Sequence, residues 1–438
     1  MSKQGNILLG FYGDDLTGST DASEFICRAG AKAVLFLDPP SLEQLRNYRG
    51  LNAYGIAGLT RSLSPQAMEK ELMPAFKMMK EAATRHVHYK VCSTFDSSSK
   101  VGSIGKAIDC GAEIFQNEFV PVLGGMPALG RFCVFGNLFA KMGTAGNGNI
   151  YRIDRHPSMS KHPVTPANES DLRLHLGSQT KKKFGLIDIT LIEKNVEQWN
   201  EQIQNDNEVI LLDVMNEDQF LKIGEWIDSQ YHQKSLFSVG SSGIEMALGS
   251  YWNKTGKLRA VESWPVIKSV NPLLVVSGSC SPVTARQIQY AKNIGFEEIV
   301  VDASKICETN TVAAAELQKL VHLLREKKDA IIHTGERDGV NLPSKVLGRL
   351  LGVIAKEGVE KGNVTRVVVA GGDTSSYVAR SMGIEALEMI APLVPGAPLC
   401  KAYSVNKAID GIEVNLKGGQ VGGEDYFVIV KNGSASVQ

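Results

Sequence analysis

Short apolar runs alternate with longer amphipathic segments along almost the whole of this chain. The runs have the length of buried strands, whereas a segment such as 65–84 repeats its apolar residues at helical spacing. This alternation predicts an α/β fold in which mainly parallel sheets are flanked by helices. After a first strand at 7–12, the expected strands are 33–37, 52–57, 87–92, 132–135, 208–212, 236–239, 273–277, 298–302, 330–334, 367–370 and 426–430, and the expected helices are 65–84, 283–293, 312–325, 344–356 and 376–382.

The length of the chain predicts two domains, because 438 residues exceed what one hydrophobic core usually organises. The stretch 250–271 has no sustained period and contains Trp252, Trp264 and Pro265, and a new strand is expected directly after it. We therefore predict one domain over 1–255 and a second over 270–438. Each is expected to be built on a mainly parallel sheet flanked by helices.

Charge and cysteine patterns narrow the class of partner. Forty-seven basic residues balance 47 acidic ones without a long run of either sign, so we expect neither nucleic acid nor an anionic membrane surface as a partner. We find no signal-peptide pattern and no apolar stretch of about 18 residues. The seven cysteines are scattered and never form CxxC, which argues against a disulfide framework and structural zinc. The expectation is a cytoplasmic protein that acts on small molecules.

The first expected strand runs directly into two adjacent acids, Asp14 and Asp15, followed by Thr17 where a helix begins. Ligands of open α/β sheets bind at the carboxyl ends of the strands, so this is a candidate site for catalysis. One carboxylate can accept the proton of a substrate hydroxyl while the other orients that hydroxyl or holds a cation. The alternative is a helix N-cap acid beside a surface acid.

Other candidate substrate-binding residues follow the next strands. Arg61 can form a bidentate pair with a substrate carboxylate, or it can be a solvated arginine at the start of a helix. Lys90, Ser93 and Thr94 end a further strand with a cation and two hydroxyls. His156 lies in the irregular region 143–170, which is rich in Gly, Pro, Asn and His and is typical of an anion-binding loop or a lid.

The second half lacks GxxxxGK[ST] and the protein-kinase motifs, but it has three glycine-rich turns at or near strand ends. Glycine lets backbone N–H groups approach phosphate oxygens, and a lysine beside such a turn can neutralise polyphosphate. Asp373 is the candidate ligand for Mg²⁺, with a helix N-cap as the alternative role, and Gly396 lies in a turn that can contact the base or ribose. The candidate nucleotide-binding residues are Ser277, Gly278, Ser279, Gly371, Gly372, Asp373, Thr374, Gly396, Lys417, Gly418, Gly419 and Gly422.

The segment 13–22, GDDLTGSTDA, resembles the opening signature of the four-carbon acid sugar kinase family. The segments 276–281, 370–375 and 416–422 resemble that family's three glycine-rich nucleotide segments, in the same order. The resemblance implies an N-terminal domain for the acid and a C-terminal domain for ATP. It also implies phosphorylation of a four-carbon sugar acid such as threonate, erythronate or a 3-oxo relative. A homodimer is a further expectation.

One segment departs from the family pattern. Lys90–Thr94 resembles the family's Lys-x-x-Ser-Thr segment, but many members carry Asp before Ser-Thr and Arg-Gly soon after, where this chain has Cys92 and Phe95-Asp96. The preferred acid can therefore differ from that of other members. Two alternatives to the kinase stay open, namely a sensor that binds sugar acid and nucleotide without catalysis, and another ATP-using enzyme such as a ligase.

Overall fold

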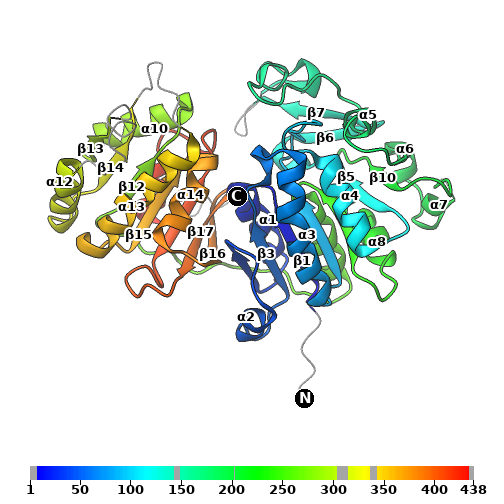
Figure 1. The fold of residues 1–438 in the computed structure, drawn as a ribbon, viewed down its shortest axis with the longest axis horizontal. Helices are drawn as coiled ribbons and strands as arrows, with labels where there is room; N and C mark the ends of the chain where they lie inside the picture. The colour runs from blue at the N-terminus through cyan, green and yellow to red at the C-terminus, as the bar shows by residue number, and fades with distance from the viewer. Residues whose placement is uncertain (1–6, 143–147, 202, 303–313, 336–342, 434–438) are drawn as a thin grey trace. The chain divides into compact units, whose positions relative to one another are not determined.

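A computed structural model describes residues 7–142, 148–201, 203–302, 314–335 and 343–433, without the side chain of Asp373. The chain forms two compact units. Unit 1 consists of Met1–Ala33 and Asp38–Val261, and unit 2 consists of Val34–Leu37 and Glu262–Gln438. Figure 1 shows helices flanking a sheet in each of them, so the predicted α/β fold class is confirmed.

The main sheet of unit 1 is entirely parallel, in the order β3-β1-β4-β11-β5-β10-β9. Strands β1, β3 and β10 are short and buried on both faces, as parallel strands covered by helices require. Helices α1, α8 and α9 pack together, and α3 packs against α4. The bounds are β1 Leu9–Gly13, β3 Ala53–Ala57, β4 His86–Lys90, β5 Val120–Leu123, β9 Phe184–Ile187, β10 Val209–Leu212, β11 Leu236–Gly240, α1 Leu16–Arg28, α2 Leu42–Asn47, α3 Pro65–Glu81, α4 Ile104–Phe115, α5 Leu172–Gly177, α6 Ile189–Ile192, α7 Glu197–Asn200, α8 Phe220–Ser229 and α9 Gly243–Lys254.

Unit 1 also contains a small antiparallel sheet of β6 (Arg131–Val134), β7 (Asn137–Lys141) and β8 (Ile150–Arg152). It begins just after the carboxyl end of β5, because Met126 and Arg131 form an antiparallel bridge. Figure 1 shows β6 and β7 beyond one end of the main sheet of unit 1. The small sheet therefore lies beside the edge at which ligands of α/β folds bind.

The sheet of unit 2 has the order β13-β14-β12-β15-β18-β17-β16-β2. Its first five strands are parallel to one another, whereas β17, β16 and β2 each run antiparallel to the strand before them. The bounds are β2 Ala33–Phe36, β12 Leu274–Ser277, β13 Glu297–Val300, β14 Ala330–His333, β15 Arg366–Ala370, β16 Ala386–Val394, β17 Ala397–Tyr403, β18 Glu413–Lys417, α10 Pro282–Asn293, α12 Ala314–Arg325, α13 Ser344–Gly362, α14 Gly372–Met382 and α15 Tyr426–Asn432.

Three differences from the sequence-based expectations concern unit 2. Residues 426–430 form helix α15 and not a strand, because Tyr426, Phe427 and Val430 are buried at helical spacing. Helix α14 begins at Gly372, four residues before the expected start at 376. Strand β2, from the N-terminal part of the chain, pairs with β16. The chain passes from unit 1 to unit 2 after Val261, inside the aperiodic stretch 250–271.

Candidate active site

The carboxyl ends of the unit 1 strands form one edge that collects most of the predicted acceptor residues. Gly13 of β1, Lys90 of β4 and Gly240 of β11 lie side by side in register. Asp14 follows Gly13 directly, and its backbone N–H donates to the carbonyl of Lys90 at 2.9 Å. The register of the sheet thus brings together residues that are far apart in the sequence.

Arg61 joins the two adjacent acids. Its Nε and Nη2 donate to the two carboxylate oxygens of Asp14 at 3.1 and 2.8 Å, and its Nη1 lies 2.6 Å from Oδ2 of Asp15. Asp14 and Asp15 are only 3 and 5% exposed. Burial raises the pKa of Asp14, the guanidinium of Arg61 opposes that shift, and the neighbouring Asp15 adds to it. The three side chains form a compact, partly neutralised acid cluster.

Asp15 is also the N-cap of helix α1. Its Oδ1 accepts from the backbone N–H of Gly18 at 2.6 Å, and its Oδ2 accepts from the Thr17 hydroxyl at 3.1 Å. A Cβ on Gly18 would lie 2.7 Å from that Oδ1 and 3.3 Å from Nζ of Lys90. The N-cap role and the site position therefore coexist in Asp15, whereas Asp14 has no capping role.

Lys90 also belongs to a second buried polar cluster, whose other members the sequence analysis did not predict. Its Nζ donates to the carbonyl of Val91 at 3.1 Å and lies 3.5 Å from Oδ2 of Asp21. The same oxygen accepts from the hydroxyl of Ser242 at 2.6 Å, while Oδ1 of Asp21 and the hydroxyl of Ser241 are buried without a hydrogen-bond partner. Burial raises the pKa of Asp21. These unsatisfied atoms mark a polar site at the carboxyl edge.

Ser93 and Thr94 lie in the loop after β4. Thr94 Oγ1 is 3.0 Å from Cys92 Sγ, and burial raises the pKa of the Cys92 thiol. Phe95 is buried in the left-handed region at φ 55°, a conformation that costs free energy for a residue other than glycine. The next turn is held by the Ser97 hydroxyl, 2.9 Å from Nε2 of His175.

His156 is 6% exposed and lies in the loop that follows η3 (Ile153–Arg155). Its Nδ1 accepts from the backbone N–H groups of Ser158 and Met159 at 3.2 and 3.3 Å. Burial lowers the pKa of His156, and the charge of Arg131 lowers it further. The predicted His156 thus lies within electrostatic range of Arg131, a cation that the sequence analysis did not select.

Three glycine-rich turns of unit 2 meet at the carboxyl edge of its sheet. Ser277 of β12, Ala370 of β15 and Lys417 of β18 are paired in register. The backbone N–H of Gly278 donates to the carbonyl of Ala370 at 3.2 Å, and that of Gly371 donates to the carbonyl of Lys417 at 2.9 Å. Turns separated by up to about 140 residues in the sequence therefore form one continuous backbone surface.

A side chain would be unfavourable at one glycine in each of two of these turns. Gly371 has φ 124° and caps helix α14. A Cβ on Gly278 would lie 2.6 Å from Cγ2 of Thr374, which is in the first turn of α14. The approach of these backbones leaves N–H groups at the start of α14 next to the β12 turn, which suits an anion. Gly372 and Thr374 are in that first turn, as is the backbone of Asp373, whose side chain lies outside the described part.

Lys417 is fully buried at this edge. Its Nζ donates to the hydroxyl of Thr284 at 3.1 Å and lies 5.3 Å from the ring centroid of Tyr426. Among the residues that the structure describes, no carboxylate forms an ion pair with it, and burial lowers the pKa of Lys417 to about 7. A bound anion would stabilise the charged form of this buried amine.

The remaining predicted nucleotide residues surround Lys417. The segment 418–423 is fixed by α10, because the Thr284 hydroxyl donates to the carbonyl of Gly419 at 2.9 Å and Gln287 Nε2 donates to that of Gly422 at 3.2 Å. A Cβ on Gly419 would lie 2.8 Å from Oγ of Ser279, so the first and third turns are in contact. Gly418 joins this segment to β18.

Gly396 lies in the turn between β16 and β17, at φ 76°. Leu399 of β17 pairs with Asn415 of β18, so the antiparallel register puts this turn at the same edge as Lys417. The side chain of Asn415 donates to the carbonyls of Ala397 and Pro398 at 2.9 and 3.2 Å. The hairpin is therefore fixed where it can contact a nucleotide.

The described residues were also searched for a metal-binding group of side chains and for a membrane-spanning helix. No group of three or more His, Cys, Asp or Glu side chains there is arranged to hold a metal ion. No described helix is both long and apolar enough to cross a membrane.

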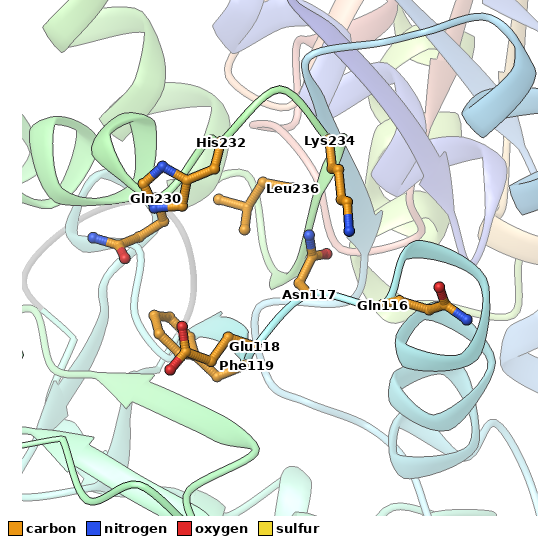
Figure 2. Close-up of a pocket in the computed structure, with 8 residues that line it drawn as sticks. All are labelled: Gln116, Asn117, Glu118, Phe119, Gln230, His232, Lys234 and Leu236. Carbon is orange, nitrogen blue, oxygen red and sulfur yellow. The ribbon is translucent and has the colours of Figure 1, made fainter.

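A cavity of about 120 Å³ opens at the opposite edge of the unit 1 sheet. Figure 2 shows that Phe119 and Leu236, at the amino ends of β5 and β11, line it together with His232 and Lys234. None of the predicted site residues lines this cavity. It is separate from the acid cluster at the carboxyl edge.

Comparisons with known proteins define the class of this chain as a sugar-acid kinase that uses ATP. A family model described as "Sugar-binding N-terminal domain" matches residues 9–248, and one described as "Nucleotide-binding C-terminal domain" matches residues 274–427. The 3-oxo-isoapionate kinase of Paraburkholderia graminis is 38% identical over 454 residues, which cover 98% of this chain and 94% of that protein. The 3-oxo-tetronate kinase of Pseudomonas savastanoi pv. phaseolicola is 26% identical over 433 residues, which cover 96% of each chain.

The chain belongs to the four-carbon acid sugar kinase family, as the resemblance of its motifs predicted. A solved protein from Salmonella typhimurium LT2, which carries the provisional description tRNA synthase, has a TM-score of 0.79 and 25% identity to this chain. The superposition covers 97% of this chain and 99% of that protein. A Haemophilus influenzae structure shares the fold, with a TM-score of 0.72 and 22% identity over 96% of this chain and 99% of its own.

Proposed function

We propose that this enzyme transfers the γ-phosphoryl group of ATP to a hydroxyl of a 3-oxo sugar acid, with the acid bound at the carboxyl edge of unit 1 and ATP at that of unit 2. The observation that carries the ATP assignment is the buried Lys417 among three glycine-rich turns. The relatives act on 3-oxo acids, and the one at 38% identity is named for 3-oxo-isoapionate. We therefore rank 3-oxo-isoapionate ahead of 3-oxo-tetronate, threonate and erythronate.

Asp14 is the proton acceptor in this proposal. The substrate oxygen attacks the γ-phosphorus, its proton passes to the carboxylate of Asp14, and the bond from the γ-phosphorus to the β,γ-bridging oxygen breaks to release ADP. Asp14 suits this role because burial raises its pKa and because it caps no helix. Asp15 and Arg61 hold the Asp14 carboxylate in position.

The phosphates of ATP are proposed to contact Lys417, the backbone of 278–279 and the first turn of α14. Mg²⁺ would arrive with ATP, since this ion usually keeps several waters and binds through phosphates and one or two carboxylates. Asp373 and the hydroxyl of Thr374 are the proposed protein contacts of the Mg²⁺–ATP complex, and the ion would neutralise phosphate charge.

Three further expectations remain proposals. The use of ATP, together with free thiols at the six described cysteines, supports a cytoplasmic location. We also propose a homodimer, which light scattering of the purified protein checks. Nucleic acid is not a proposed partner, because the formal net charge is zero.

The test is ADP formation from ATP and Mg²⁺ with a panel of sugar acids, followed by mass spectrometry of the product. The 3-oxo acids are generated in the assay by a dehydrogenase, because β-keto acids decarboxylate on storage. A phosphorylated acid from at least one substrate supports the kinase. Acid binding without ADP from any substrate supports the sensor instead, and release of AMP supports a ligase.

A further inference from the structure

Arg131, the first residue of β6, has two unused hydrogen-bond donors. Its Nη1 donates to the carbonyl of Leu129 at 2.7 Å and lies 3.4 Å from the carbonyls of Gly130 and Lys141. Its Nε is buried without any partner, and Nη2 makes no hydrogen bond to a described residue. Nε and Nη2 form the edge of a guanidinium that binds a carboxylate through two parallel hydrogen bonds.

Asp96 offers a matching unused acceptor. Its Oδ1 is buried without a partner, and Asp96 interacts electrostatically with both Arg131 and Cys92. Within the described part of the chain, no ion pair joins Asp96 to Arg131. A buried guanidinium donor and a buried carboxyl acceptor within electrostatic range of each other, both unsatisfied, are costly unless a third molecule completes their hydrogen bonds.

Both side chains lie at the same carboxyl edge of the unit 1 sheet as the acid cluster. Leu123 at the end of β5 pairs with Gly240 of β11, and Gly240 pairs with Lys90 of β4. Arg131 is bridged to Met126, three residues beyond the end of β5, and Asp96 lies six residues beyond Lys90. The thiol of Cys92 is within electrostatic range of both Arg61 and Asp96.

The substrate carboxylate needs a cation that the acid cluster does not supply. Arg61 already uses Nε, Nη1 and Nη2 on Asp14 and Asp15. Lys90 is bonded to a backbone carbonyl and faces Asp21. Arg131 is the described arginine at this edge with an unoccupied bidentate face.

We propose that Arg131 binds the carboxylate of the sugar acid through Nε and Nη2, and that Oδ1 of Asp96 accepts a hydrogen bond from a hydroxyl of the same molecule. This inference rests on the proposed function, because it assigns the acid to the same edge. The pair selects its ligand by two rules. Arg131 binds only ligands that carry a carboxylate. Asp96 favours ligands with a hydroxyl donor nearby and repels a second anionic group.

The second rule favours a branched acid. 3-Oxo-isoapionate carries a hydroxymethyl branch that 3-oxo-tetronate lacks, and this branch supplies an additional hydroxyl donor. A site that hydrogen-bonds such a hydroxyl discriminates against an analogue without it, because the buried carboxylate is then left unpaired. Asp96 is thus assigned as a specificity residue for the branch.

The experiment compares Arg131→Ala and Arg131→Lys with Arg155→Ala, whose arginine is exposed and lies three residues beyond β8 in the same part of unit 1. Each variant is assayed with 3-oxo-isoapionate and with erythrulose, a neutral ketose that lacks the carboxylate. We expect kcat/KM for the acid to fall about 10- to 100-fold in Arg131→Ala, with partial recovery in Arg131→Lys. The KM for ATP and the rate with erythrulose should not change.

Asp96→Ala is tested in parallel on the branched and linear acids. We expect its preference for 3-oxo-isoapionate over 3-oxo-tetronate to shrink about tenfold, while Asp96→Asn, which keeps an acceptor oxygen, retains most of it. An equal loss for acid and ketose in Arg131→Ala, or an unchanged preference in Asp96→Ala, would overturn the proposal. If the wild type makes no ADP, the proposed function fails, and calorimetric binding of the acid to the Arg131 variants still decides the assignment of the subsite.

Discussion

At the scale of single residues, the two adjacent acids share Arg61 as a partner but differ in their other contacts. Arg61 contacts both, but only Asp15 also caps α1 through Gly18 and Thr17. We expect Asp14→Asn to reduce kcat by roughly 10²- to 10⁴-fold and to leave the KM for ATP unchanged, because an amide cannot accept the proton. Steady-state kinetics measure both values, and Asp218→Asn, an exposed acid of unit 1, is the matched control.

Asp15→Asn should behave differently from Asp14→Asn. Asparagine is also a good N-cap, so we expect the melting temperature to be nearly kept, while the weakened contact to Arg61 lowers kcat less than in Asp14→Asn. If Asp15→Asn is the more damaging of the two while Asp14→Asn stays active, the proton acceptor is Asp15.

Lys417 illustrates a trade-off between stability and function. Burial lowers its pKa to about 7 in the folded protein from 10.5, so the unfolded chain binds more protons between these values and stability rises with pH across this window. Replacement by the uncharged Lys417→Met removes that cost. We expect Lys417→Met to melt at a higher temperature than the wild type, with a larger difference at pH 6 than at pH 9, and to lose ATP binding.

Thermal melts at the two pH values and nucleotide titration check this expectation. Lys431→Met is a matched control, because its lysine is paired with Asp329 at 2.6 Å and does not lie in the glycine-rich site. A lower melting temperature for Lys417→Met at pH 6 would show that the amine stabilises the protein without ATP.

The sequence makes some residues of the site easier to find than others. Asp14 and Asp15 directly follow β1, Lys90 ends β4 and Arg61 lies four residues beyond β3, and parallel strand ends meet at one edge. Asp21 is inside α1, and its partner Ser242 is 221 positions away in the sequence. No local pattern distinguishes such a residue from a solvated helical acid. Arg131 was missed for a similar reason, since only the fold leaves its Nε unsatisfied.

At the scale of elements, the shape of the nucleotide site depends on glycines at the junctions between strands and helices. Gly371 has φ 124° where β15 turns into α14, a conformation that L side chains rarely adopt. We expect Gly371→Ala to cost about 1–3 kcal/mol of unfolding free energy and to weaken ATP binding, because the first turn of α14 must shift. Denaturant unfolding and nucleotide titration measure the two effects.

Gly411 provides the control for that substitution. It also has a positive φ, 84°, but a Cβ there would meet no atom within 4 Å, and it lies between β17 and β18. Gly411→Ala should therefore carry a similar backbone cost without any change in ATP affinity. Equal losses of ATP affinity in both variants would mean that Gly371 acts on stability alone.

Elements with long periodic patterns were predictable, whereas short apolar runs were ambiguous. The pattern of α3 is long enough to identify a helix, but five apolar residues at 426–430 fit either structure. The surroundings decide the outcome, because Gly433 ends α15 at φ 69° and its buried side chains lie at helical spacing. The antiparallel pair β16 and β17 was not expected, since its strands are partly exposed and carry Glu388 and Lys401.

At the scale of the whole molecule, the sequence predicted an α/β chain but not the path of β2. Val34–Leu37 is a continuous apolar run that looks like the second strand of the first sheet. The structure pairs it with β16 instead, and Leu37 N–H donates to the carbonyl of Glu385 at 2.9 Å. Only long-range partners determine which sheet accepts such a strand, so local sequence cannot decide it.

The position of β2 has a consequence for dividing the chain. A fragment of residues 262–438 lacks β2, so β16 becomes an exposed edge strand and the Arg380 guanidinium loses the carbonyl of Leu37, which it contacts at 2.5 Å. Exposed edge strands pair with other chains. We expect this fragment to aggregate, and the same fragment with residues 32–38 attached by a flexible linker to remain monodisperse and to bind ATP. Size-exclusion chromatography, thermal melting and nucleotide titration compare the two.

A linked segment with Leu35→Asp and Leu37→Asp is the control, because charges at these buried positions should prevent its docking. Equal behaviour of all three fragments would show that unit 2 does not depend on β2.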